Sequence, residues 1–345
     1  MTMTGARTFP LPPGAEATAP PERRGVARDE VRLMAVRPGR LTTTRFRDLP
    51  DLLQPGDLVV VNTSATLPAR VPARRADGAA VPLHVSTSLD DGIWVVELRR
   101  PDNSGPDLGV EPGTVLALPG GVRVTLLAGF PDGGRSRLWR ARTDPSVTPT
   151  EYLPRHGQPI RYGYVHGAFP LADYQNVYAS EPGSAEMASA GRPFTHGVLV
   201  RLMARGIPVV PVTLHSGVSS PEAHEPPYPE RFAVPEVTAR LVTSTRQAGG
   251  RVIAVGTTVT RALETATDDD GRTRAAGGWT DLVLGPTRGT RAVTGLITGL
   301  HAPEASHLLL LEAVAGPELV DAAYRRAVGE HYLWHEFGDS MIFLP

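Results

Sequence analysis

Two kinds of apolar pattern alternate along most of this chain. Six segments have the run of apolar, often β-branched residues that is typical of strands, at positions 31–36, 57–61, 207–214, 252–255, 279–284 and 293–300. Four segments have apolar residues at helical spacing, at positions 194–206, 235–249, 307–315 and 317–332. Strands that alternate with helices along the chain indicate an α/β domain.

The pattern changes between residues 70 and 144, where short strands replace the mixture of strands and helices. The predicted strands lie at 82–86, 93–98, 114–118, 122–127 and 137–142, and turns that contain glycine or proline separate them. Regularly spaced turns between short strands are typical of a small all-β module such as a barrel. We therefore expect an α/β fold class, with a sandwich-type main domain formed by residues 21–67 and 151–345 and a small β-barrel domain inserted at 68–150.

The N-terminal segment carries neither a packing pattern nor a targeting signal. Its first 20 residues are rich in proline, glycine, alanine and threonine, so we expect a disordered lead-in at 1–20. No charged region followed by an apolar one marks a secretory signal, and no apolar run approaches the length of a membrane span. These features favour a soluble, cytoplasmic protein without a membrane partner.

Composition narrows the chemistry that the chain can perform. Its 345 residues suffice for two domains, and its 35 basic and 36 acidic residues nearly cancel. The overall charge therefore neither favours nor excludes a polyanion. An RNA contact would need a local patch, such as Arg70, Arg74, Arg75, Arg99 and Arg100, but scattered arginines more often form a solvated surface. The chain has no cysteine, which excludes disulfides, thiolate nucleophiles and Cys-ligated metals.

The segment 251–264 is the main candidate for a functional turn. Its strand residues 252–255 lead through Gly256 into a helix that Thr257 or Thr258 can cap. Open α/β sheets bind ligands at the carboxyl ends of their strands, and free N–H groups at a helix start favour an anionic group. The alternative is an ordinary strand-to-helix connection with a threonine cap.

Other strand ends also carry polar side chains. Asn62 follows one strand, and His215 and His301 follow two others. Either histidine could act as a general base near neutral pH, or it could be a structural histidine. His331 and His335 have metal-compatible spacing on a predicted helix, but no third ligand follows at a recognisable interval, so we expect no metal. The glycine-rich nucleotide signatures are also missing, which disfavours Rossmann methyltransferase or dehydrogenase chemistry.

Ten short motifs together resemble a known family. They are PERR (21–24), GDLVVVN (56–62), LPARV (67–71), DYQNVYA (173–179), SAGRPFT (189–195), VTLHSG (212–217), RVIAVGTTVTRALE (251–264), GWTDLVL (278–284), LHAP (300–303) and FGDSMIF (337–343). In this order they resemble the S-adenosylmethionine:tRNA ribosyltransferase-isomerases of queuosine biosynthesis, over nearly the whole chain.

The resemblance implies both a fold and a reaction. The implied fold is an α/β main domain with an inserted β-barrel. Family members use S-adenosylmethionine as a ribosyl donor to the amine of a 7-aminomethyl-7-deazaguanine in the tRNA anticodon, and they release adenine and methionine. Such chemistry needs a base that removes a proton next to the sulfonium and groups that protonate adenine, but no metal. We expect a monomer.

The same resemblance implies the site residues. We expect His215 to be the base and His301 its competitor, in a donor pocket at the carboxyl ends of the strands at 207–214 and 252–255. The candidate substrate-binding residues are Asn62, Arg70, Gly191, Thr213, Gly256, Thr257, Thr258, Arg261, Asp281 and Asp339.

The chain also departs from the family pattern in strand-end loops. Asp173 stands in place of a family arginine and Pro193 in place of a histidine, and residues 219–221 and 224–231 replace a Gly-Thr-Phe and a His-Met-His stretch. These changes suggest a retained donor pocket with an altered acceptor side. Two alternatives to the tRNA reaction therefore stay open: cleavage or rearrangement of S-adenosylmethionine on a small-molecule acceptor, and a non-catalytic module that binds the sulfonium nucleoside or RNA.

Overall fold

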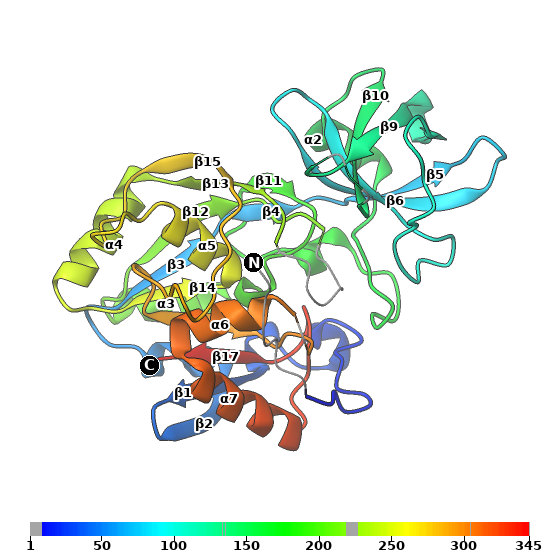
Figure 1. The fold of residues 1–345 in the computed structure, drawn as a ribbon. Helices are drawn as coiled ribbons and strands as arrows, with labels where there is room; N and C mark the ends of the chain where they lie inside the picture. The colour runs from blue at the N-terminus through cyan, green and yellow to red at the C-terminus, as the bar shows by residue number, and fades with distance from the viewer. Residues whose placement is uncertain (1–8, 133, 135, 219–226, 304, 345) are drawn as a thin grey trace.

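The computed structural model of the chain has two lobes, a mixed α/β lobe and a smaller all-β lobe (Figure 1). It describes residues 9–344 except 133, 135, 219–226 and 304. The larger lobe is built on a nine-stranded sheet with the strand order β15-β13-β12-β3-β14-β16-β17-β1-β2. The mixed α/β class predicted from the apolar pattern is therefore confirmed.

The central strands of this sheet run in parallel, and antiparallel pairs flank them. Strands β12, β3, β14 and β16 form three consecutive parallel pairs, so their carboxyl ends meet at one edge. The strands of the sheet are β1 (Arg32–Arg37), β2 (Arg40–Arg45), β3 (Leu58–Asn62), β12 (Val209–Leu214), β13 (Glu230–Val234), β14 (Val252–Val255), β15 (Ala276–Thr280), β16 (Gly295–Gly299) and β17 (Ser340–Phe343). A separate pair is formed by β4 (Ser64–Thr66) and β11 (Glu181–Ser184).

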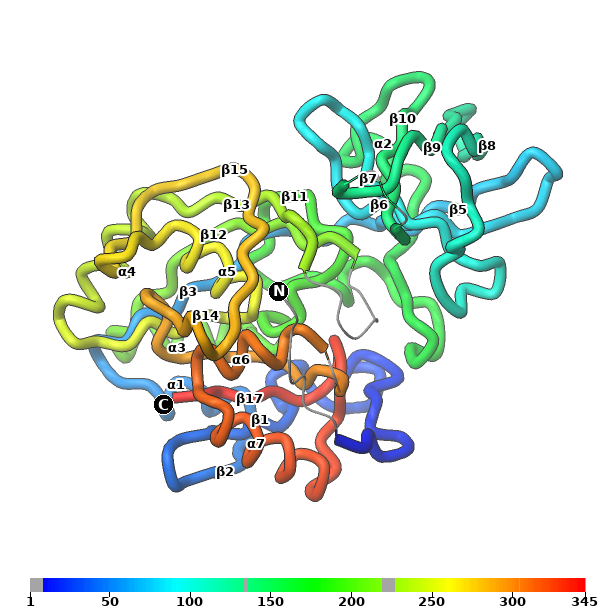
Figure 2. Tube along the Cα trace, in the orientation of Figure 1, coloured from blue at the N-terminus to red at the C-terminus, as the bar shows by residue number. Residues whose placement is uncertain are grey.

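Helices cover both faces of the sheet, which explains why its central strands are apolar throughout. In β3, Leu58 and Val60 pack with residues of α4 to α7, whereas Val59 and Val61 pack with residues of α1 and α3 on the other face. Figure 2 shows the path of the chain through these elements. The helices are α1 (Leu49–Leu52), α2 (Pro149–His156), α3 (His196–Ala204), α4 (Glu236–Gln247), α5 (Thr257–Thr265), α6 (His307–Ala315) and α7 (Pro317–Gly329). The 3-10 helices are η1 (Pro21–Arg24), η2 (Arg28–Glu30), η3 (Phe46–Asp48), η4 (Pro119–Gly121), η5 (Leu171–Tyr174) and η6 (Ser189–Gly191).

The smaller lobe is a closed ring of six strands in the order β10-β7-β6-β5-β8-β9. Its strands are β5 (Arg70–Arg74), β6 (Ala80–Ser88), β7 (Trp94–Leu98), β8 (Val115–Ala117), β9 (Arg123–Gly129) and β10 (Leu138–Asp144). In β10 the buried Trp139 and Ala141 alternate with the exposed Arg140 and Arg142, as expected for a barrel wall. In the described part of the chain, none of these strands pairs with the nine-stranded sheet.

Contacts of the smaller lobe continue beyond residue 150. Helix α2 starts at a Thr148 cap and places Tyr152 against Trp94, with ring centroids 5.7 Å apart. Beyond the helix, Gln158 pairs with Arg70 through two backbone hydrogen bonds of 2.8 and 2.9 Å. The segment that packs on this lobe is thus longer than 68–150.

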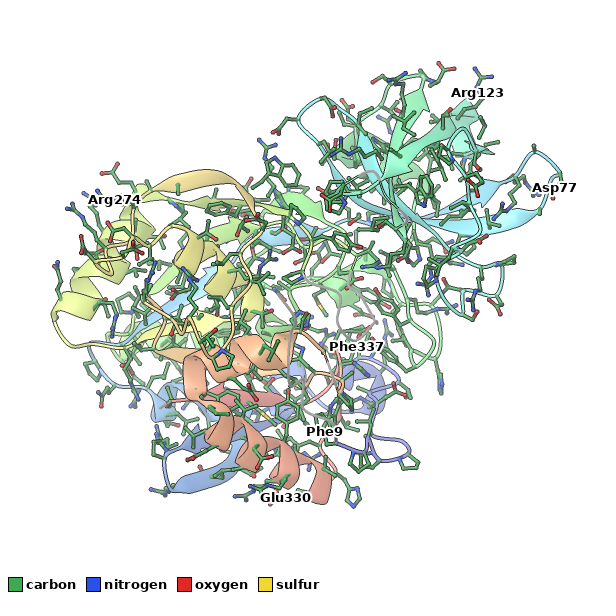
Figure 3. All side chains as sticks on the ribbon, viewed as in Figure 1. Phe9, Asp77, Arg123, Arg274, Glu330 and Phe337 are labelled. Atoms are coloured by element: carbon green, nitrogen blue, oxygen red, sulfur yellow. The ribbon has the colours of Figure 1, made fainter. Side chains whose placement is uncertain are left out.

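Residues 9–20 are packed onto the larger lobe, in contrast to the expected disordered lead-in. Ala15 and Ala17 are buried and exchange backbone hydrogen bonds with Trp334. Phe9 is partly buried on the larger lobe (Figure 3), and its ring centroid lies 5.1 Å from that of Tyr324. A few apolar residues among the prolines suffice here because Tyr324 and Trp334 provide an apolar surface on which they pack. Residues 1–8 lie outside the described residues.

Two predicted boundaries near the C-terminal half are wrong. The strand predicted at 279–284 is β15, which starts at Ala276 and ends at Thr280, because its pairing with β13 fixes the register. Helix α7 ends at Gly329 instead of residue 332. His331 and His335 follow it with φ values of 54° and 70°, so they do not share a helix face. In the described chain no group of three acidic or histidine side chains could hold a metal ion.

Within the described residues, the helices are too short or too polar to cross a membrane.

Candidate active site

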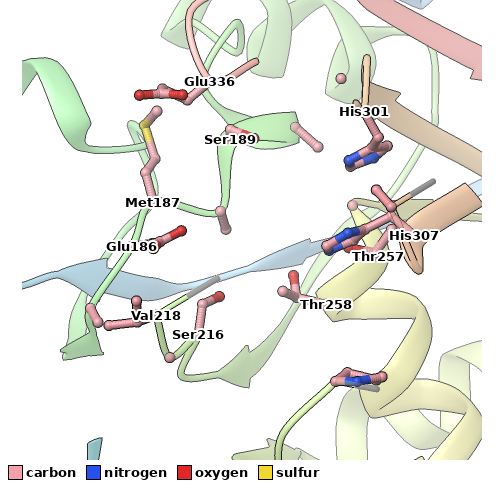
Figure 4. Close-up of a pocket in the computed structure, with 18 of the residues that line it drawn as sticks. Glu186, Met187, Ser189, Ser216, Val218, Thr257, Thr258, His301, His307 and Glu336 are labelled. Atoms are coloured by element: carbon pink, nitrogen blue, oxygen red, sulfur yellow. The ribbon is translucent and has the colours of Figure 1, made fainter. Parts of the chain in front are cut away.

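A cavity of about 520 Å³ lies where the carboxyl ends of the central strands face the smaller lobe. Residues that follow β12, β14 and β16 line one part of it, and Ser86, Thr87 and Phe130 of the smaller lobe line another. Figure 4 shows Glu186 and Glu336 on the side opposite to His301 and His307. The cavity therefore has an acidic end and a histidine end.

The turn at Gly256, Thr257 and Thr258 borders this cavity, and its role in donor binding stays a prediction. Gly256 has φ 95° and is itself the N-cap of α5, while Thr257 and Thr258 are the first two helical residues. The expected threonine cap is wrong, because no side chain of the described residues caps this helix start. Gly256, Thr257 and Thr258 all line the cavity, so the first N–H groups of α5 lie at its wall.

Asn62 connects the chain segments that carry the cavity wall through four hydrogen bonds of its side-chain amide. Its amide nitrogen donates to the Leu214 carbonyl (2.8 Å) and to Thr258 Oγ1 (3.3 Å), and its amide oxygen accepts from the Leu214 and Ser64 N–H groups (both 3.0 Å). Asn62 is buried and does not line the cavity. It ties together the ends of β3, β12 and α5, on which the site is built.

His215 lines the cavity and is held by serine side chains. Its Nδ1 lies 2.7 Å from Ser64 Oγ, which in turn lies 2.6 Å from Ser184 Oγ. Gly183 lets the ring approach, because a Cβ at that position would lie 2.4 Å from Nδ1. Burial, and then Arg231, lower the pKa of His215, although Glu181 opposes this shift. The ring is therefore neutral near pH 7 and able to accept a proton.

His301 also lines the cavity, stacked on His307 with ring centroids 4.6 Å apart and an interplanar angle of 2°. Its Nε2 lies 2.9 Å from Thr298 Oγ1. Burial, and then His307 and His335, lower the pKa of His301 well below its ordinary value. Burial, and then Arg261, lower the pKa of His307 to about 4. The pair thus presents two neutral imidazoles, and one ring nitrogen of His301 is already engaged.

Arg261 borders the cavity, but its donors bind the protein itself. It forms an ion pair with Glu230 and donates to the carbonyls of Leu282 (3.1 Å) and Thr280 (3.2 Å). The other Glu230 oxygen accepts from the Gly217 N–H (3.0 Å). Burial raises the pKa of Glu230 and Arg261 opposes this shift. Arg261 therefore fixes the loops that follow β12 and β15.

Two of the predicted substrate-binding residues are held within the larger lobe, away from the cavity. Thr213 Oγ1 lies 3.2 Å from Thr63 Oγ1. Asp339 accepts from the N–H groups of Arg32 and Leu333, both at 2.8 Å. Neither residue is among those that line the cavity, so both assignments stay predictions.

Three more predicted residues, Arg70, Asp281 and Gly191, are not among the residues that line the cavity, so their assignments also stay predictions. Arg70 lies in β5 and bonds Gln158, and Asp281 is exposed after β15. Gly191 packs beneath the lining residue Ala190, where a Cβ would lie 2.1 Å from the Tyr178 hydroxyl oxygen. The Tyr178 hydroxyl thus lies so close to the Gly191 backbone that only glycine, which has no Cβ, fits at this position.

The acidic end of the cavity was missed by sequence reasoning. It contains Glu16, Glu186 and Glu336, which come from three distant parts of the chain. None of them belongs to a motif or follows a predicted strand, and Glu16 falls in the segment expected to be disordered. The described lining contains four glutamates, including Glu230, and one arginine.

Comparison with known proteins assigns the family. Residues 6–343 match the family described as queuosine biosynthesis protein. The chain belongs to this family. An S-adenosylmethionine:tRNA ribosyltransferase-isomerase of Symbiobacterium thermophilum is 35% identical over 337 residues, with 92% of this chain and 94% of the relative covered. One of Acidiphilium cryptum is 34% identical over 353 residues, with 97% of each chain covered.

The fold of a family member supports this assignment. The crystal structure of an S-adenosylmethionine tRNA ribosyltransferase from Thermotoga maritima matches with a TM-score of 0.54 at 29% identity, covering 99% of this chain and 100% of that one. The predicted family resemblance is therefore confirmed, and it extends over both lobes.

Two departures from the family pattern lie outside the cavity lining. The buried Arg192 donates to the Asp173 carbonyl (2.8 Å) and to Glu22 (2.9 Å), and Arg23 pairs with the Asp173 carboxylate (3.3 Å). Asp173 and Pro193 are both absent from the lining. The departures at 219–221 and at 224–226 lie outside the described residues. Asp173 thus binds two arginines, the buried Arg192 through its carbonyl and the exposed Arg23 through its carboxylate, which gives the change at 173 a structural reason.

Proposed function

We propose that this chain is an S-adenosylmethionine-dependent ribosyl transferase-isomerase that acts on 7-aminomethyl-7-deazaguanine in tRNA and releases adenine and methionine. The observation that carries the proposal is the cavity beside the Gly256 turn. Its volume of about 520 Å³ is typical of a small-molecule site. Its four glutamates and one arginine favour a cationic ligand, and the sulfonium donor carries a net positive charge.

We infer the orientation of the donor from two features of the cavity wall: the N-terminus of α5 and the imidazole of His215 at the end of β12. The methionine carboxylate would lie at the N–H groups of Thr257 and Thr258, where the helix dipole favours an anion. His215 would then remove the proton next to the sulfonium, because its neutral ring faces the cavity and Ser64 fixes its orientation. His301 is the second candidate for this base.

We also propose that the smaller lobe is an inserted β-barrel domain, within the predicted limits 68–150 and with α2 packed on it, in a main domain of residues 21–67 and 151–345. Its closed strand order and its lack of pairing with the large sheet in the described chain support this division. Ser86, Thr87 and Phe130 bring it to the cavity wall, where it can contact the acceptor. A tRNA acceptor would place the reaction in the cytoplasm.

The expected result is that the wild-type protein releases adenine and methionine from S-adenosylmethionine only with tRNA that carries the aminomethyl deazaguanine. Chromatography of the small molecules, together with mass spectrometry of the digested tRNA, measures both products. Adenine without tRNA would favour a small-molecule acceptor. A lack of turnover with either acceptor would contradict the proposal.

A glycine substitution tests the position of His215. Gly183→Ala is expected to lower the rate of adenine release by about 10²-fold, because its Cβ would displace the His215 ring from Ser64. Gly277→Ala is the matched control, since a Cβ there meets the Phe232 carbonyl oxygen at an ordinary 3.6 Å. Equal rates for the two variants would show that the ring position does not matter.

A further inference from the structure

The acidic end of the cavity contains three carboxylates, and each of them is bonded to a tyrosine or histidine side chain. The Tyr164 hydroxyl donates to Glu336 Oε2 at 2.6 Å, and the Tyr162 hydroxyl donates to Glu186. The rings of Tyr162 and Tyr164 lie 6.0 Å apart, and Tyr164 stacks on His335 at 4.2 Å. His335 in turn lies 3.2 Å from Glu16 Oε1. All of these residues line the cavity.

Charge balance makes this end suitable for a cation. Within the described lining the single arginine is Arg261, and it is already paired with Glu230. The groups that act on Glu336 are its hydrogen-bond donor Tyr164 and the carboxylates of Glu186 and Glu16, with Tyr174 and His335 also beside it. Carboxylates beside aromatic faces bind a primary ammonium well.

We propose that Glu336 is the catalytic base that removes a proton from the ammonium of the acceptor's aminomethyl group, while Glu186 holds that ammonium in place. This inference rests on the proposed function. The N–H bond breaks, the proton moves to the Glu336 oxygen that Tyr164 does not bind, and the electron pair stays on nitrogen. The neutral amine can then form its bond to the ribosyl carbon, which a protonated amine cannot do.

The local environment supports this assignment of the base. Burial raises the pKa of Glu336 from 4.5 to about 7, and the carboxylates of Glu186 and Glu16 add to the shift against the opposing Tyr164 hydrogen bond. A primary alkylamine has a pKa of roughly 10, so Glu336 is a better-matched proton acceptor than an ordinary glutamate. Since the carboxylate is the active form, activity should rise with pH through about 7.

The test is the pH profile of single-turnover adenine release with S-adenosylmethionine and an anticodon stem-loop that carries the aminomethyl deazaguanine. Wild-type protein should show a rate that rises through about pH 7 and then levels. Glu336→Gln should lower the rate at pH 7 by about 10²- to 10⁴-fold, and its pH profile should lack the rise through about pH 7, which we call the limb. Its rate should instead rise about tenfold per pH unit toward pH 9, as the amine loses its proton without help.

Three further variants separate catalysis from structure. Tyr164→Phe keeps the ring on His335 but removes the hydrogen bond that favours the carboxylate, so the limb should move to higher pH. Glu186→Gln should raise KM for the stem-loop and move the rise in rate to lower pH, because the Glu186 carboxylate no longer raises the pKa of Glu336. Glu318→Gln changes an exposed glutamate of α7 outside the lining and should match wild type. Calorimetric titration should give an unchanged Kd for S-adenosylmethionine in Tyr164→Phe and Glu318→Gln, the two variants that keep every carboxylate of the cavity.

The outcomes distinguish this inference from the proposed function. If wild-type protein turns over but Glu336→Gln keeps a parallel pH profile, the inference is wrong and the function stands. If Glu336→Gln does not fold, an unshifted limb in Tyr164→Phe overturns the inference, and a shifted one supports it. If wild-type protein releases no adenine with the stem-loop at any pH, both fail.

Discussion

Replacement of His215 by alanine is expected to lower the single-turnover rate of adenine release by about 10²- to 10⁴-fold, the usual effect of removing a general base. The structure gives two reasons. The ring lines the cavity, and its bond to Ser64 and its contact with Gly183 fix its orientation. Its lowered pKa keeps it neutral near pH 7, so it can take up the proton next to the sulfonium.

The measurement compares four proteins under the same saturating donor concentration. His166→Ala, at an exposed histidine outside the lining, should behave as wild type. His301→Ala tests the competing base, whose Nε2 is already engaged by Thr298. Because the imidazole is not the group that anchors the donor in this proposal, Kd for S-adenosylmethionine should change little in His215→Ala. A near-wild-type rate for His215→Ala would exclude His215, whatever His301→Ala does.

Replacement of Arg261 by methionine is expected to reduce the free energy of unfolding by about 3–5 kcal/mol, because it leaves the buried Glu230 carboxylate without its cation. Arg261 is 7% exposed and Glu230 16%, so water can replace only part of the lost interaction. The carbonyls of Leu282 and Thr280 would lose their donors as well. The loops that shape the cavity should loosen along with the lobe.

Urea unfolding followed by circular dichroism measures this effect. The double variant Arg261→Met, Glu230→Gln should be more stable than the single variant, since the amide needs no counter-charge and still accepts from the Gly217 N–H. Arg123→Ala breaks an exposed pair with Asp144 at the far side of the barrel (Figure 3) and should change stability by less than about 1 kcal/mol. A single variant as stable as wild type would show that the ion pair does not hold the loops.

Several parts of the fold were predictable because they follow from local physics. A strand covered on both faces must be apolar at every position, and β14 at Val252–Val255 is buried throughout. A turn from such a strand into a helix needs a residue that tolerates positive φ, and Gly256 supplies it. Helix α6 was predicted with its observed bounds, His307–Ala315. These signals need no knowledge of partners elsewhere in the chain.

Other local signals misled because distant contacts decide the outcome. Thr258 has the chemistry of a helix cap, but its hydroxyl lies beside the Asn62 amide and Gly256 occupies the cap position. The proline-rich segment 9–20 has the composition of a disordered lead-in, yet Trp334 and Tyr324 provide the apolar surface on which it packs. The composition of a segment gives its own apolar content, but it does not show on which surface of the folded protein the segment packs.

The sequence by itself determined the α/β class, the family and the strand-end turns that border the cavity, because periodicity and short motifs are local properties of the chain. Only the tertiary structure decided which ionisable side chains lie together at the acidic end of the cavity. Tyr164 and Glu336 are 172 positions apart, and His335 and Glu16 are 319 apart, yet both pairs line the same cavity. Their proximity depends on strand order and on packing between the lobes, and the raised pKa of Glu336 exists only because folding removes its carboxyl from water and places it beside other carboxylates.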